Sequence, residues 1–164
     1  MAKEDFNITS IVNSDGCFDL QFRKDTRHDR INSPTYYRWK AQFVVTEPKS
    51  KIKVLQKIKK EFECGEITIS KDQARLSVQK INDIAQIIVP FFRKKPLKDN
   101  KKKDFEMWAK AVEILLKNKG KAMADWKKNE LHSLIEIQKV CAKYKERPKK
   151  SKWLEIAHMM AKSK

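Results

Sequence analysis

In some segments of this chain the apolar residues recur with the period of a helix, and in others they alternate with polar residues at the two-residue period of a strand. The helical period is clearest where Ile52, Leu55, Ile58 and Phe62 recur, after Pro48 and before Gly65. The expected elements, in chain order, are a helix over 8–15, strands over 17–23 and 36–46, a helix over 50–63, strands over 67–70 and 74–78, and helices over 81–91 and 105–115. Two further helices are expected between residues 125 and 164, around a basic linker.

This order of elements is typical of an α+β fold in which helices cover one face of an antiparallel sheet. Apolar residues such as Phe18, Leu20 and Phe43 should face the helices, so their neighbours should face the other way. The polar residues expected on that opposite face are Asp19, Gln21, Arg23, Arg38, Lys40, Gln42, Glu66, Thr68, Ser70, Gln73, Arg75 and Ser77. Taken alone, this pattern also describes an ordinary solvated sheet face.

The charge balance narrows the choice of partner. With 38 Lys and Arg residues against 21 Asp and Glu residues, the formal charge is +17, which suits a polyanion and favours nucleic acid. A membrane partner is not expected, because the chain has no long apolar run, signal-peptide pattern or lipidation motif; we expect a soluble, intracellular protein. Cys17, Cys64 and Cys141 lack zinc or disulfide spacing and are interpreted as reduced.

Candidate chemistry begins in the first expected helix. Ser10 and Ser14 lie four residues apart, which puts two small side chains on one face where another backbone can approach closely. Asp15 follows, and Gly16 is expected to end the helix. A carboxylate would then be fixed beside a sheet and a close helix contact. The same pattern is also consistent with an ordinary short amphipathic helix that ends in an Asp-Gly turn.

Residues 8–16 align without gaps with the signature of the LAGLIDADG homing endonucleases, and the chain resembles that family over roughly residues 6–118. The other matching blocks, in the family's order and spacing, are Phe43-Val44-Val45-Thr46-Glu47, Phe62-Glu63-Cys64-Gly65-Glu66-Ile67, Ile88-Val89-Pro90-Phe91-Phe92 and Asn100-Lys101-Lys102-Lys103-Asp104-Phe105. The resemblance implies the family's αββαββα saddle in residues 1–118. Residues 119–164 are expected to form a basic helical extension packed on the same domain.

The resemblance also implies an active site. Asp15 matches the family's metal-binding acid, and the backbone carbonyl of Ser14 matches a position that can face the metal, which implies Mg²⁺ with Mn²⁺ or Ca²⁺ as substitutes. Glu47 falls where the family has a polar residue that holds water around the metal. Lys101 falls where the family has a lysine near the scissile phosphate. Lys102 or Lys103 could instead be the counterpart of the family's lysine, because a shift of one residue within the run 101–103 cannot be detected. The run could also be an ordinary solvated basic segment.

Two signature helices pack together in this family, here through Ser10 and Ser14, and each brings one acid to the site. Since we find one signature, the resemblance implies a homodimer that reads a pseudo-palindromic site in double-stranded DNA. The polar sheet face would lie in the major groove, where Gln and Arg pair with base edges. Lys149 and Lys150, in the basic linker, would contact flanking phosphates, unless the tail only caps the core.

The resemblance therefore implies a divalent-metal-dependent, site-specific double-strand DNA endonuclease, encoded within a mobile intron of a chloroplast or mitochondrion. Asn13 stands where the signature commonly has an acid, and Ser10 stands where it has glycine. These departures and the basic tail leave two alternatives open. The chain could be an RNA-binding intron maturase, or a non-catalytic nucleic-acid-binding protein on the same scaffold.

Overall fold

The computed structural model describes residues 6–24, 37–143, 157, 159, 161 and 162. Its elements are α1 (Ile8–Asp15), β1 (Gly16–Lys24), β2 (Tyr37–Pro48), η2 (Lys49–Lys51), α2 (Ile52–Phe62), β3 (Glu66–Ser70), β4 (Gln73–Val78), α3 (Ile81–Asp83), η3 (Ile84–Ile88), α4 (Val89–Lys94), α5 (Asp99–Lys117), η4 (Met123–Asp125) and α6 (Lys128–Lys143). This order confirms the predicted α+β class.

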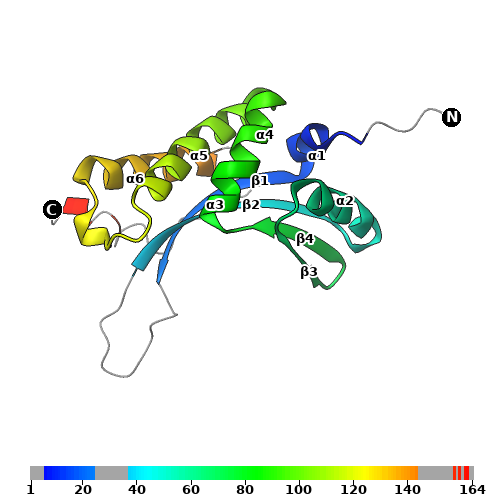
Figure 1. Ribbon diagram of the computed structural model, residues 1–164, viewed down its shortest axis with the longest axis horizontal. Helices are drawn as coiled ribbons and strands as arrows, with labels where there is room; N and C mark the ends of the chain where they lie inside the picture. Colours follow the sequence, from blue (N-terminus) through cyan, green and yellow to red (C-terminus); the bar gives the residue numbers. More distant parts are fainter. Residues whose placement is uncertain (1–5, 25–36, 144–156, 158, 160, 163–164) are drawn as a thin grey trace, which may run out of the picture.

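The four strands form one antiparallel sheet in the order β1-β2-β4-β3. Figure 1 shows the helices above this sheet, with the underside of the sheet arched and uncovered by them. The two longest strands, β1 and β2, pair from Gly16↔Val45 to Lys24↔Tyr37, whereas β4 pairs with β2 only over residues 43–48. The uncovered underside is the face that the sequence predicts to be polar.

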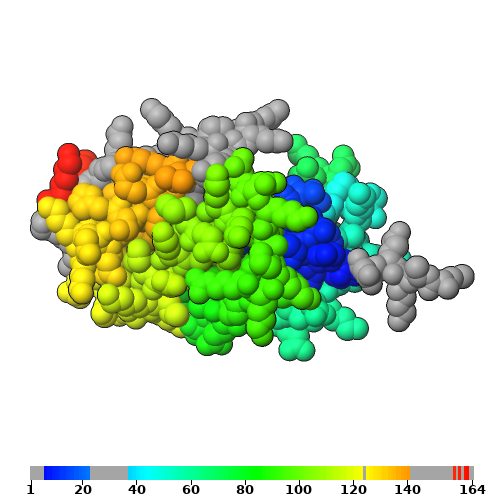
Figure 2. Space-filling model, turned by 90° about the horizontal axis from the view of Figure 1, so that it is seen from above, coloured from blue at the N-terminus to red at the C-terminus, as the bar shows by residue number. Residues whose placement is uncertain are grey.

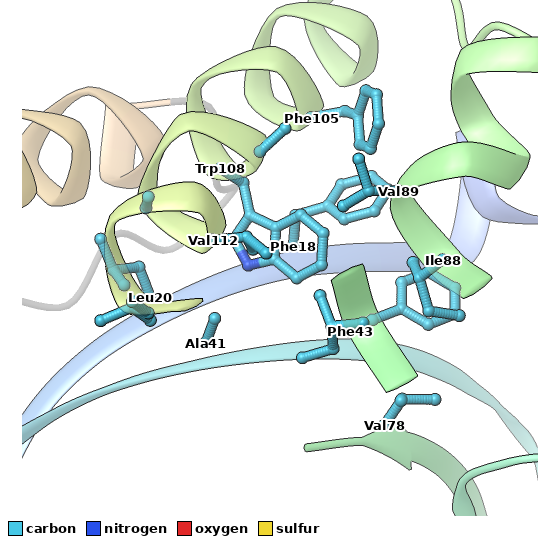
Figure 3. Close-up of a cluster of buried hydrophobic side chains, with 14 of the residues drawn as sticks. Phe18, Leu20, Ala41, Phe43, Val78, Ile88, Val89, Phe105, Trp108 and Val112 are labelled. Carbon is cyan, nitrogen blue, oxygen red and sulfur yellow. The ribbon is translucent and has the colours of Figure 1, made fainter. Parts of the chain in front are cut away.

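The core lies between the sheet and the helices and is rich in aromatic rings (Figure 3). Phe18 is fully buried, with ring centroids 5.5 Å from Phe43 and 5.0 Å from Trp108. The indole Nε1 of Trp108 donates to the backbone oxygen of Asp19 at 2.9 Å, so its buried polar group is satisfied. These contacts confirm which strand face is apolar and bind α5 to β1.

Helix α6 extends the same core. Leu131, Leu134 and Ile135 are buried and belong to one cluster with the sheet residues. The side-chain Nε2 of Gln138 donates to the backbone oxygen of Leu20 at 3.2 Å, which joins α6 to β1 directly. The linker 145–150, with Lys149 and Lys150, lies outside the described residues.

The helix expected over 81–91 differs from a regular α-helix. Residues Ile84–Ile88 form a π-helical turn between α3 and α4, and Pro90 follows within the first turn of α4. Proline has no N–H and its ring crowds the carbonyl four residues earlier, so a wider turn before it accommodates the ring. The helix expected over 105–115 begins earlier in the structure, at Asp99. The prediction missed its exposed first turn because that turn carries no apolar periodicity.

Gly16 ends α1 as predicted, but for a different reason. Its φ of −89° is open to any residue, so left-handed backbone is not what requires glycine here. A Cβ atom at this position would lie 2.5 Å from Val12 Cγ1 and 2.8 Å from the Val12 carbonyl oxygen. Glycine therefore permits the chain to enter β1 directly against the last turn of α1.

Candidate active site and nucleic-acid face

Helix α1 places its last residue at the molecular surface. The Asn7 side chain accepts from the Ser10 backbone N–H at 3.1 Å and begins the helix, while Ile8 and Val12 are buried against the core. Ser10, Ser14 and Asp15 are exposed. Figure 2 shows α1 at the surface beside α2 and α4. The helix therefore presents its small residues and its terminal acid outward.

The carboxyl groups of Asp15 and Glu47 meet at the end of α1. Gly16 pairs with Val45, and Glu47 is two residues further along β2 on the same face, so the register carries Glu47 to Asp15. Glu47 is only 6% exposed. Burial, followed by the hydrogen bond to Asp15 and the charge of Asp15, raises the pKa of Glu47 from 4.5 to about 7, against a smaller opposing effect of Lys51.

This pairing fits a divalent cation. Two carboxyl groups within hydrogen-bonding distance repel one another once both are ionised, so the pair keeps a proton below about pH 7. A hard cation with oxygen ligands relieves the same repulsion by taking the place of that proton. Among the residues that the structure describes, no group of three or more His, Cys, Asp or Glu side chains is arranged to hold a metal. One copy of the chain thus offers this acid pair.

Lys101 completes the cluster. Its ammonium donates to the backbone oxygen of Gly16, the residue after Asp15. Lys101 is half-buried, whereas Lys102 and Lys103 are exposed. The structure therefore brings Asp15, Glu47 and Lys101 together from α1, β2 and α5, and of the three lysines Lys101 is the one that contacts the end of α1.

A second face of α1 holds the segment that leads to Lys101. Thr9 Oγ1 donates to the backbone oxygen of Lys95 at 3.1 Å, and Asn13 Oδ1 accepts from the backbone N–H of Lys98 at 3.1 Å. Since Thr9 and Asn13 are one turn apart, they form a continuous polar stripe. This role of Asn13 was not predicted from the sequence, nor was the proximity of Lys51 to Glu47.

The uncovered sheet face carries the predicted polar residues as cross-strand neighbours. The registered pairs are Asp19↔Gln42, Gln21↔Lys40, Arg23↔Arg38, Thr68↔Arg75, Glu66↔Ser77 and Ser70↔Gln73. Directly paired residues of an antiparallel sheet share a face, so the strand register supports the predicted grouping. For Arg23 this holds for the backbone, because its side chain is not described.

Gln42 differs from the expectation of a freely projecting side chain. It is 6% exposed, and its Nε2 donates to Asp19 Oδ2 at 3.0 Å. Gln21 Nε2 donates to the same oxygen at 2.6 Å. These side chains satisfy one another on the neighbouring strands β1 and β2, whereas Thr68 on β3 and Arg75 on β4 are exposed.

The LAGLIDADG endonuclease profile matches residues 11–112, which include the C-terminal part of α1, the sheet and most of α5. This chain belongs to the LAGLIDADG endonuclease family. Probable intron-encoded endonuclease 3 of Neurospora crassa is 29% identical over 111 residues, which are 66% of this chain and 20% of that protein. The chain therefore spans about a fifth of the length of that curated relative.

Solved structures share the LAGLIDADG fold with this chain. The homing endonuclease I-TnaI matches with a TM-score of 0.74 at 22% identity, over 98% of each chain. I-SmaMI, in a structure bound to an uncleaved DNA target in the presence of calcium ions, matches with a TM-score of 0.76 at 19% identity. That match covers 96% of this chain and 49% of I-SmaMI. These likenesses confirm the predicted LAGLIDADG saddle.

None of the helices described is long and apolar enough to cross a membrane.

The raised pKa of Glu47 predicts how the stability of this LAGLIDADG protein depends on pH without metal. Glu47 ionises near 4.5 in the unfolded chain and near 7 in the folded one, so stability should fall as pH rises through that window. The expected loss is at most about 3 kcal/mol. Glu47→Gln should flatten this dependence in urea unfolding with EDTA, measured at about pH 5 and about pH 8.

The matched control is Glu106→Gln, which changes an exposed acid on α5 and should keep the wild-type dependence. If Glu47→Gln retained the full loss of stability between the two pH values, the acid pair would not be its source.

Proposed function

We propose that the chain is a homodimeric, Mg²⁺-dependent endonuclease that cleaves both strands of a specific DNA site, and that it is encoded by a mobile intron of organellar origin. The observation that carries the proposal is the meeting of the Asp15 and Glu47 carboxyl groups beside Lys101, at the exposed end of the signature helix. Membership of the LAGLIDADG endonuclease family supports the reaction class.

Each residue of the cluster has a separate role in phosphodiester hydrolysis. Asp15 and the backbone carbonyl of Ser14 would hold Mg²⁺, which when bound supplies activation of water and stabilisation of the leaving oxygen. Glu47, beside Asp15, would orient the attacking water. Lys101 would stabilise the negative charge that develops on the phosphate. Mn²⁺ or Ca²⁺ would substitute as ligands of the same carboxylates.

The dimer follows from the number of acids and from the exposed face of α1. Cleavage of two strands needs an acid for each scissile phosphate, and one chain supplies one signature acid. Ser10 and Ser14 are exposed and small, so a second α1 can approach closely along them. A two-fold axis between the helices would place two copies of Asp15 side by side. The likeness to one half of the I-SmaMI chain supports this arrangement.

The uncovered sheet face would contact the base edges of the DNA, and the basic linker 145–150 would contact the phosphate backbone of the DNA. Arg75→Ala should cost roughly 1–3 kcal/mol and relax preference at one position in each half-site, since a bidentate contact to a base is lost. Lys149→Ala with Lys150→Ala should weaken binding to all sequences alike and lower the salt slope by roughly one unit per lost contact. Binding to the cognate site and to single-base variants, over a range of salt, measures both.

A reversed outcome would contradict this map of contacts. Uniform loss from Arg75→Ala, or position-specific loss from the two tail lysines, would exchange the roles of the sheet and the tail. If neither change affected binding, the nucleic acid would lie on another surface.

The direct test of the function is footprinting and cleavage on DNA that spans the insertion site of the chain's own gene. The expected result is a protected pseudo-palindromic site, cut on both strands only when Mg²⁺ is present. Absence of cutting, together with tight binding to the host intron RNA, would replace the nuclease by an RNA-binding maturase.

A further inference from the structure

A second polar feature lies beyond the end of β4, away from the acid pair. It is a hollow of about 520 Å³ between β2, the segment after β4, the end of α5 and the loop that follows α5. The charged residues that line it are all cations: Arg38, Lys40, Lys80, Lys119 and Lys121. We call it the basic hollow. Like charges gathered around one space repel each other, so an anion in that space is stabilised by all of them at once.

The basic hollow is continuous with the uncovered sheet face. Beyond Val78 the chain leaves the sheet, so the stretch of β2 before Phe43 has no β4 neighbour and borders the hollow. Arg38 and Lys40 belong to that stretch and are also in register with residues of the sheet face. The ammonium of Lys40 donates to Gln79 Oε1, which ties β2 to the segment after β4. A strand of nucleic acid lying along the sheet therefore passes directly to the hollow.

The far wall of the hollow is held in place by hydrogen bonds. Trp126 Nε1 donates to the backbone oxygen of Lys121 at 3.2 Å, and the Lys121 backbone N–H donates to the Asn118 oxygen at 3.0 Å. Asn118 is buried, and its Nδ2 donates to the Ile114 oxygen at 2.9 Å. This loop thus carries Lys119 and Lys121, both exposed, on a backbone anchored to α5.

We infer that the basic hollow binds the phosphodiester backbone of duplex DNA where the duplex leaves the sheet face. Phosphate is the anion that such a set of ammonium and guanidinium groups neutralises, and the connection through Arg38 and Lys40 selects a polymer over a free ion. The inference rests on the proposed function, because it takes duplex DNA as the ligand. It adds Lys80, Lys119 and Lys121 as contacts beyond the sheet face, the acid pair and the basic linker.

The test compares two double variants. Lys119→Ala with Lys121→Ala removes cations of the hollow, while Lys59→Ala with Lys60→Ala removes two exposed cations of α2 and is the matched control. Binding is measured over a range of salt on a long duplex around the site and on duplexes trimmed stepwise from both ends. On the long duplex the hollow variant should have a salt slope that is lower by about two units than that of wild type. Its affinity at 0.1 M salt should fall by up to roughly 60-fold. The difference from wild type should vanish on the shortest duplex, and the control should match wild type on all of them.

Equal slopes for the two variants, or a loss that is unchanged by trimming, would overturn the inference. A second measurement keeps it separate from the proposed function. Lysine acetylation, read by mass spectrometry with and without nonspecific duplex at low salt, should show protection of Lys119 and Lys121 but not of Lys59 and Lys60. Protection without any site-specific cutting would retain the hollow and reject the nuclease. Protection by intron RNA alone, or no protection at all, would reject the duplex as its ligand.

Discussion

Asp15→Asn is expected to abolish strand cleavage while DNA affinity stays within a few-fold of wild type. The change removes the charge of the proposed metal ligand and keeps the side-chain size, so transition-state stabilisation of several kcal/mol should be lost, which corresponds to roughly 10³-fold or more in rate. Binding is expected to depend on the proposed contacts of the sheet face and of basic residues elsewhere. Single-turnover cleavage of the cognate duplex in Mg²⁺, with a parallel binding measurement, separates the two effects.

The control for this experiment is again Glu106→Gln, an acid exposed on α5 that should cleave at the wild-type rate. Misfolding is not expected to explain the loss. Removing the Asp15 charge takes away one of the causes that raise the pKa of Glu47, so the metal-free variant should be at least as stable as wild type above pH 7. Cleavage at the wild-type rate by Asp15→Asn would show that the assigned acid is wrong.

The fold was predictable because the apolar residues that recur with helical or strand spacing are also the residues that form the core. Phe18 and Phe43 follow the strand period and also meet Trp108, which follows the helical period of α5. Each pattern therefore supported the other. The π-helical turn at Ile84–Ile88 was not predictable from periodicity, because the apolar spacing is the same and the turn depends on how the Pro90 ring is accommodated.

The candidate site was predictable only as far as the resemblance reached. Asp15, Glu47 and Lys101 matched family positions, but the contact between the two carboxyl groups depends on the register of β1 with β2, which no local pattern determines. Asn13 carries no apolar signal and acts through a backbone N–H of the 95–101 segment, so only the folded chain reveals it. Gln42 has the right parity for the sheet face, yet burial turns its side chain to Asp19.

Ser10→Leu is expected to separate the dimer and to abolish cleavage with it. Ser10 is exposed on α1 one turn before Ser14, where the proposed two-fold axis brings two copies of the helix together. Overpacking costs about 1–3 kcal/mol per site, and the axis applies the cost in both subunits. The dimer dissociation constant should rise by roughly 30-fold to 10⁴-fold. Sedimentation over a range of micromolar concentrations, with cleavage measured on the same samples, tests both expectations.

The matched control is Ser133→Leu, which makes the same change on the exposed side of α6 and should leave the dimer intact. Raising the Ser10→Leu concentration should restore cleavage in step with dimer formation, because the acid itself is unchanged. A wild-type protein that stays monomeric at micromolar concentration and still cuts both strands would reject the shared site. In that case Asp15 and Glu47 of a single copy would have to serve each strand in turn, and cleavage would proceed through a nicked intermediate independent of protein concentration.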